Sequence, residues 1–81
     1  MTLSEIASLD EKYYMNTFGK RLPVAFERGE GTKLYATDGR VFNDFLGGIA
    51  VNALGHSHPK FVAALKAQAG KLLHTSSLYY I

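Results

Sequence analysis

Apolar residues recur at intervals of three or four near the start of the chain, which is the spacing of one face of a helix. The repeating positions are Leu3, Ile6, Leu9 and Tyr13. Ser4 is a candidate N-cap, and Ser8 with Glu11 has the spacing of a capping box. The pattern predicts an amphipathic helix over residues 4–15, followed by a connector that Gly19 interrupts.

Three short segments in the middle of the chain are rich in residues that favour strands. They cover residues 24–28, 33–37 and 40–43, and the turn-forming runs RGEG and DG separate them. Asp38-Gly39 is a strong hairpin signal, because glycine adopts positive φ without steric cost. We therefore expect a small antiparallel meander whose open edges have only the flanking helices to cover them.

The clearest helical pattern begins at Pro59, which suits the first helical position because its missing N–H needs no partner there. Ser57 or His58 can occupy the N-cap. One stripe of this helix is apolar and consists of Phe61, Val62, Leu65, Ala69, Leu72 and Leu73. We expect the helix over residues 59–73, and the apolar run that reaches Ile81 resembles the beginning of a further, truncated segment.

Together these elements predict one incomplete α+β unit. Its expected parts are an N-terminal helix (1–16), a β-meander (17–46), a Gly-rich loop (47–58), a linking helix (59–73) and the start of a truncated segment (74–81). A domain of about this size buries only about 60% of its unfolded surface, so we expect marginal stability.

Composition narrows the class of protein. Hydrophobic residues make up 47% and charged residues 20% of the chain, which is typical of a globular protein. The absence of cysteine excludes a disulfide framework and makes the cytoplasm the expected compartment. The first residues do not resemble a signal peptide, and no run reaches the roughly 18 apolar residues of a membrane span. The net charge of +2 is scattered, which argues against nucleic-acid binding.

The three histidines do not have the spacing of a metal site. His58 and His74 lie at opposite ends of the predicted helix, about 24 Å apart at 1.5 Å per residue, so one ion cannot bind both. We expect no metal, and we expect His56 and His58 to hydrogen-bond the loop and to cap the helix.

Other candidate chemistry is sparse. The runs RGEG and LGG match no phosphate-binding fingerprint, and Gly47, Gly48 and Gly55 permit positive φ, close backbone approach or plain packing. All six lysines have polar neighbours, whereas a lysine that binds a cofactor covalently needs desolvation or a cationic neighbour. Asp38 and Asp44 are predicted to be turn and surface groups. No complete active site is visible, and no catalytic or cofactor-binding residue is assigned.

Four longer motifs, taken in order, resemble the N-terminal part of one enzyme family. They are YYMNTFG, PVAFERGEG, DFLGGIAVNALGHSHP and QAGKLLHTSSLYY, within a resemblance that runs from about Lys12 to Ile81. The family is the class III aminotransferases, which use pyridoxal 5′-phosphate, and MNT, GIAVNALGH and HTSSLYY point to its acetylornithine branch. The resemblance implies a fold type I homodimer whose small domain includes this α+β segment.

The resemblance also implies substrate-binding roles. It assigns them to Phe18, Gly48, Ile49, Ala50, Leu78 and Tyr79. The three loop residues would line the substrate side of the pocket, with Ile49 as an apolar wall. Phe18 would lie near the entrance, and the C-terminal pair would reach towards the partner subunit's pocket. One departure concerns Phe18: the run FGKRLP is one residue longer than the family pattern, so that Gly19 could hold its place.

By the same resemblance, the family's cofactor lysine, its ring-nitrogen aspartate and its carboxylate-binding arginine lie further along the chain. We therefore expect the 81 residues alone to be inactive and to bind no cofactor, which belongs to the full-length family member. The implied reaction moves the terminal amino group of N-acetylornithine to 2-oxoglutarate, in arginine biosynthesis in the cytoplasm. Transaminases of ornithine, succinylornithine and 4-aminobutyrate share the class pattern and stay open as alternatives.

A free-standing, non-catalytic interaction module is the alternative from another class. The apolar loop, the open sheet edge and the terminal LYYI would then form its binding face for a protein partner. A module of this kind should be monodisperse and melt cooperatively, whereas a truncated piece should aggregate or stay partly unfolded.

Overall fold

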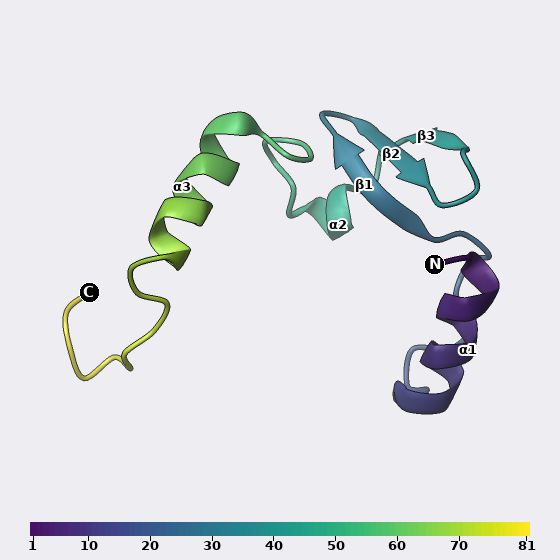
Figure 1. Ribbon diagram of the computed structural model, residues 1–81, viewed down its shortest axis with the longest axis horizontal. Helices are drawn as coiled ribbons and strands as arrows, with labels where there is room; N and C mark the ends of the chain where they lie inside the picture. The colour runs from purple at the N-terminus through teal and green to yellow at the C-terminus, as the bar shows by residue number, and fades with distance from the viewer.

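The computed structural model describes all 81 residues and places a helix on either side of a three-stranded sheet (Figure 1). In chain order the elements are α1 (Leu3–Tyr13), β1 (Phe26–Glu30), β2 (Lys33–Ala36), β3 (Val41–Asn43), α2 (Gly47–Ala50) and α3 (Pro59–Ala69). The strands are antiparallel and neighbour one another in sequence order. The predicted α+β class, with a helix, a meander and a helix, is confirmed.

A capping box begins α1, but it lies earlier than the sequence analysis predicts. Thr2 is the N-cap: its Oγ1 accepts a hydrogen bond from the Glu5 N–H at 3.3 Å, and its own N–H donates to Glu5 Oε2 at 2.8 Å. The predictions for Ser4 and Ser8 are therefore wrong, because the Thr2 box already satisfies donors of the first turn. The helix also ends two residues early, where the backbone becomes extended at Tyr14.

The first strand begins and ends later than predicted. It continues through Gly29 and Glu30, which the sequence analysis assigned to a turn. Glu30 pairs directly with Lys33, so the connection to β2 consists of Gly31 and Thr32 alone. Gly31 has φ +58°, a left-handed conformation that suits such a tight hairpin.

The second hairpin lies where Asp38-Gly39 predicts it. Gly39 has φ +90°, and Asp38 Oδ1 accepts a hydrogen bond from the Arg40 N–H at 3.1 Å. Asp38 Oδ2 also accepts from Arg40 Nε at 2.8 Å. The Arg40 N–H, followed by the guanidinium, lowers the pKa of Asp38 below its ordinary value.

The packed part of the chain is confined to the sheet. Ala36 is the one fully buried residue, with 2% of its surface exposed. Phe26 and Phe42 meet edge to face at 5.5 Å, and the Arg28 guanidinium lies 3.5 Å above the Tyr35 ring. Only neighbouring strands contact one another, and no helix packs against the sheet. The sheet edges, for which the flanking helices are the only cover that the sequence offers, are therefore left open.

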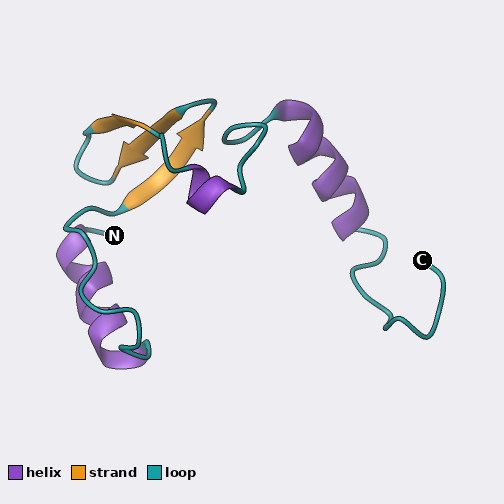
Figure 2. Cartoon of the chain, turned by 180° about the vertical axis from the view of Figure 1, so that it is seen from behind, coloured by secondary structure: helices purple, strands orange, loops and turns teal.

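The chain as a whole is open. Its radius of gyration is 16.5 Å, whereas a compact chain of this length has about 12 Å. Its accessible surface is 7460 Å², against about 4,800 Å² for a compact monomer of this mass. Figure 2 shows α1 and α3 extending from opposite ends of the sheet. Their apolar positions, such as Leu9, Phe61 and Leu65, remain exposed.

The last helix begins at Pro59, as predicted, but it ends at Ala69 rather than at residue 73. Gly70 forms the C-cap, because glycine is a poor helix former and closes the last turn. His58 occupies the N-cap position but makes no side-chain capping bond, so this part of the prediction is wrong. None of the helices has both the length and the apolar character that crossing a membrane requires.

We expect the sheet to be more stable locally than the helices. Helices of 11 residues without tertiary contacts are marginal in water. The last residue of β2, Ala36, is in contrast 2% exposed, and its N–H donates to the Arg40 carbonyl at 2.9 Å. Amide hydrogen exchange of the 81-residue chain should be at least about tenfold slower at Ala36 than in the middle of α3. Equal protection at the two places would contradict the prediction.

Candidate functional site

The Gly-rich segment after the sheet begins with a left-handed turn. The four residues of α2 have φ of 60°, 65°, 64° and 62°. The Ala50 N–H donates to the Leu46 carbonyl, and the Val51 N–H donates to the Gly47 carbonyl, each at 2.9 Å. These bonds close one helical turn of the uncommon hand. The segment 47–58, which the sequence analysis describes as a loop, therefore starts with regular backbone.

This hand is costly for two of the four residues. Glycine adopts it freely, but a residue with a Cβ pays about 1–2 kcal/mol in a left-handed helix. Ile49 is β-branched, which makes a positive φ a genuine outlier. The side chain of this strained residue is not buried, because Ile49 is 77% exposed. Packing of the isoleucine within the chain therefore cannot account for the strain.

Asp44 ties the end of β3 to the beginning of α2. Its Oδ1 accepts hydrogen bonds from the Leu46 and Gly47 N–H groups, both at 2.9 Å. Its Oδ2 lies 2.6 Å from His56 Nε2, and only 8% of the Asp44 side chain is exposed. The Gly47 N–H, and after it His56, lowers the pKa of Asp44 below its ordinary value. The prediction of a surface group is wrong for Asp44.

The chain beyond α2 is bonded to the first hairpin. Gly31 and His56 exchange two backbone hydrogen bonds, at 2.9 and 2.8 Å. Ser57 Oγ donates to the Gly29 carbonyl at 2.7 Å. We call Asp44, His56 and Ser57, together with Gly29, Gly31 and Gly55, the loop anchor.

Glycine is required at two positions of the loop anchor for reasons of space. A Cβ on Gly29 would lie 2.6 Å from the His56 ring, and a Cβ on Gly55 would lie 2.8 Å from the Gly31 carbonyl oxygen. Gly55 also has φ +76°. The sequence analysis allowed for close approach at Gly55, and the structure shows what approaches. Gly29, in contrast, was predicted only as part of a turn.

The predicted site residues fall into three separate places. Gly48, Ile49 and Ala50 are adjacent in α2. The ring of Phe18 lies 6.3 Å from that of Tyr14 at the end of α1. Residues 74–81 extend from the far end of α3, at the opposite end of the molecule from α1 (Figure 1). Leu78 and Tyr79 in this segment are 83% and 69% exposed. Within these 81 residues the structure does not bring the three groups together.

The histidines and lysines complete the inventory of chemical groups. His56 bonds the loop as predicted, through Asp44, whereas His58 Nδ1 is buried without a partner. No group of three or more histidine, aspartate or glutamate side chains is arranged to hold a metal ion. All six lysines are exposed.

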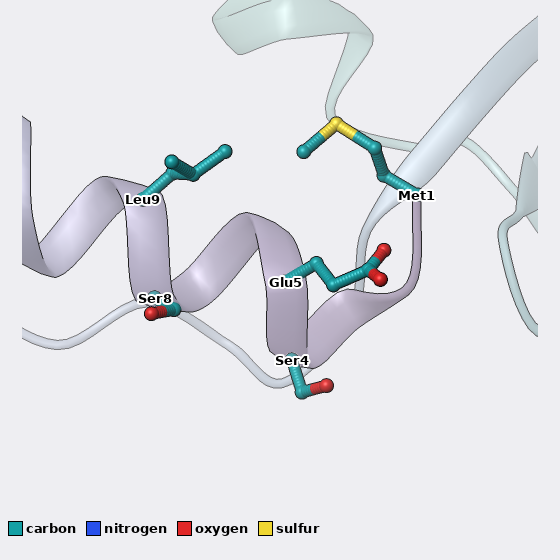
Figure 3. A pocket seen from close by; sticks show the side chains of 5 residues that line it. All are labelled: Met1, Ser4, Glu5, Ser8 and Leu9. Carbon is teal, nitrogen blue, oxygen red and sulfur yellow. The ribbon is translucent and has the colours of Figure 1, made fainter.

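A hollow on α1 does not provide a better site. Its lining side chains are Met1, Ser4, Glu5, Ser8 and Leu9 (Figure 3). Glu5 is engaged in the capping box, and none of the five residues has a basic side chain or a nucleophilic side chain other than a serine hydroxyl. The loop anchor and the turn that it supports are therefore the candidate functional site.

Sequence reasoning missed Asp44 because its partner lies 12 residues away. A local signal does exist, since an aspartate often accepts hydrogen bonds from N–H groups two or three residues further on. In DFLGG that spacing joins the Asp44 carboxylate to the glycine that begins the turn.

Comparison with known proteins places these features in a family. A model of the family "Aminotransferase class-III" matches residues 14–80. The acetylornithine aminotransferase of Methanocaldococcus jannaschii is 50% identical over 72 residues, which are 89% of this chain and 18% of that protein. The acetylornithine aminotransferase of Mesorhizobium japonicum is 61% identical over 61 residues, 75% of this chain and 15% of that protein. The chain thus matches only 15–18% of the length of these curated relatives.

Solved structures contain the same open arrangement. The acetylornithine aminotransferase from Elizabethkingia anophelis matches with a TM-score of 0.88 at 37% identity, over all of this chain and 21% of that one. The ornithine aminotransferase from Toxoplasma gondii matches with a TM-score of 0.86 at 28% identity, over all of this chain and 19% of that one. In both, the helices and sheet seen here are a small part of a larger chain.

A methyl group on Gly29 should loosen the loop anchor. In Gly29→Ala the new Cβ meets the His56 ring, and such overpacking costs about 1–3 kcal/mol. Hydrogen exchange at the Gly31 and His56 amides should accelerate about tenfold or more. Gly70→Ala is the matched control, because its Cβ would lie 3.6 Å from the nearest atom outside the neighbouring residues. Unchanged exchange in Gly29→Ala would contradict this account of the close approach.

The carboxyl of Asp44 should titrate below its ordinary pKa of 3.8. Because the folded-state pKa is lowered, the stabilising contribution of this carboxyl is complete above its ordinary pKa of 3.8 and is lost as pH falls through the folded-state value. His56→Ala should raise the pKa of Asp44 only partway, because the larger cause, the Gly47 N–H, remains. A ¹³C NMR titration of the carboxyl measures both values. An Asp44 pKa that His56→Ala leaves unchanged would show that the histidine does not stabilise the carboxylate.

Proposed function

The chain belongs to the class III aminotransferases, and we propose on that premise that it is the N-terminal part of an acetylornithine-type aminotransferase. The proposal is carried by the family match over nearly the whole chain together with the similarity to acetylornithine aminotransferases. The proposed reaction moves the terminal amino group of N-acetylornithine to 2-oxoglutarate, as a step of arginine biosynthesis. We place the enzyme in the cytoplasm as a homodimer.

Class III aminotransferases are pyridoxal phosphate enzymes, so the fit of this cofactor to the present residues matters. When bound, the cofactor supplies an electron sink for transfer of the amino group. A lysine that holds it must be desolvated or lie beside another cation, and all six lysines of the chain are exposed. The residues present do not fit the cofactor by themselves. We assign none of them to it and place its lysine outside residues 1–81.

Within this proposal, α2 forms a wall for the side chain of the amino donor. Gly48 and Ala50 add little bulk, so the donor meets mainly the exposed Ile49. An apolar wall excludes water beside the methylene groups of the donor, and each methylene so buried contributes about 0.8 kcal/mol of binding. The loop anchor fixes both ends of the segment that carries this wall.

The other predicted residues serve the same pocket in the proposed dimer. Phe18 is 73% exposed and lies near the substrate entrance in this proposal. Gly19, next to it, has φ +73° and open space around it, which makes a turn rather than a contact its more natural role. Leu78 and Tyr79 are exposed and are proposed to reach the pocket of the partner subunit.

Two alternatives have different support. An ornithine-type aminotransferase is the second candidate, because ornithine aminotransferase structures match the whole chain. The interaction module is not favoured, because a free-standing domain needs a core, and here only Ala36 is fully buried. The donor preference separates the two enzyme candidates.

The test begins with the protein at its natural length, captured from its source with an antibody against residues 1–81. It should bind pyridoxal phosphate and use N-acetylornithine with a kcat/KM at least about tenfold above that for ornithine, a difference of about 1.4 kcal/mol. The isolated 81-residue chain, as control, should show no saturable absorbance band with the cofactor. A preference for ornithine would overturn the donor assignment. A natural-length protein without aminotransferase activity would overturn the function.

A further inference from the structure

The handedness of the turn at Gly47–Ala50 needs a cause outside the turn itself. Its internal hydrogen bonds, from Ala50 to Leu46 and from Val51 to Gly47, would form equally well in a right-handed turn. Ile49 and Ala50 would prefer that right-handed form, because each carries a Cβ. Since the left-handed form is present, the surroundings must hold the two ends of the segment where the right-handed form does not fit.

The first end is held by Asp44. Its Oδ1 takes both the Leu46 and the Gly47 N–H, so the chain enters the turn in a fixed direction. Only 8% of the Asp44 side chain is exposed, and Oδ2 of the same carboxylate contacts His56. Nothing else in the chain hydrogen-bonds these two N–H groups.

The second end is held by His56. Its backbone makes the two-bond bridge to Gly31, and its ring lies against Gly29, where a Cβ would have no room. The ring nitrogen Nε2 is at the same time the partner of Asp44 Oδ2, at 2.6 Å. The contact between Asp44 and His56 therefore joins the two ends of the segment directly to each other and to the sheet.

We propose that Asp44 and His56 are positioning residues that keep Gly47–Ala50 left-handed and thereby determine how the enzyme selects its amino donor. The inference rests on the proposed function, in which the Ile49 side chain meets the donor. Neither residue touches substrate in this proposal. They act through the backbone conformation of Ile49, which sets the direction of its side chain.

The experiment uses the natural-length protein and the variant Asp44→Ala. In its crystal structure, φ of Ile49 should leave the positive region, because the acceptor of both N–H groups is gone. The KM for N-acetylornithine should rise about tenfold with kcat changed less than about threefold, since binding of the donor side chain is affected and the chemistry is not. The ratio of kcat/KM for N-acetylornithine over ornithine should fall by a similar factor.

A second substitution distinguishes positioning from general stability. In Asp44→Ala/Ala50→Gly, glycine lowers the cost of positive φ within the turn and leaves Ile49 in place. This variant should regain positive φ at Ile49 and at least about half of the lost selectivity. A merely structural loss at Asp44 would not be restored by removing a methyl group from an exposed turn.

Asp38→Ala is the matched control. Asp38 also accepts a backbone N–H and contacts a basic side chain, but it lies in the hairpin between β2 and β3. This variant should keep the wild-type conformation at Ile49 and the wild-type donor ratio. If Asp44→Ala does not fold, Asp44→Asn keeps the side-chain volume and Oδ1 and should change φ or the donor ratio in the same direction to a smaller extent.

The inference is overturned if the Asp44 variants that fold keep both positive φ at Ile49 and the wild-type donor ratio, or if Asp38→Ala changes that ratio equally. A failure of the proposed function looks different, because the wild-type protein would then lack aminotransferase activity. The φ measurement needs no activity, so it tests the conformational step in either case.

Discussion

The contact between Asp44 and His56 is the interaction on which the ordered centre of the chain depends. It joins the end of β3 to the segment that leads into α3, across 12 positions of sequence. The same carboxylate accepts two backbone N–H groups, and hydrogen bonds to a charged group are stronger than neutral ones. If this carboxylate lost its partners, a nearly buried charge would remain unpaired, which is far more costly than the loss of an exposed contact.

The rest of the chain has little of its own to hold it together. The strands contact one another, but α1 and α3 extend away from the sheet with their apolar faces exposed (Figure 2). The same arrangement forms about a fifth of a larger aminotransferase chain in solved relatives. This arrangement suits a part of a larger chain. The sheet and the loop anchor keep their geometry through their own hydrogen bonds, while α1 and α3 leave their apolar faces free to pack against other parts of that chain.

Local sequence signals predicted the parts of the fold that depend on local physics. Pro59 begins α3 because its fixed φ suits the first turn of a helix. Asp38-Gly39 forms the second hairpin because the turn depends only on the backbone conformations that these two residues can adopt. The failures are of two kinds. The cap at Thr2 was overlooked although its spacing to Glu5 is a local signal. The contacts of Gly29 with Ser57 and His56, in contrast, join residues that lie far apart in the sequence, which no local pattern predicts.

The candidate site shows the same contrast between what a local sequence pattern predicts and what it does not. The resemblance of GIAVNALGH to a known loop selected Ile49, but no periodicity or propensity predicts a β-branched residue at φ +64°.

The left-handed turn costs its two glycines and its two other residues different amounts of energy. Gly47 and Gly48 adopt the left-handed hand at no cost, whereas Ile49 and Ala50 continue it against their own preference. A sequence under pressure only to turn the chain would use glycine throughout or let the turn become right-handed. We propose that Asp44 and His56 hold Ile49 in this strained conformation because the direction of its side chain matters for the donor pocket of the proposed enzyme.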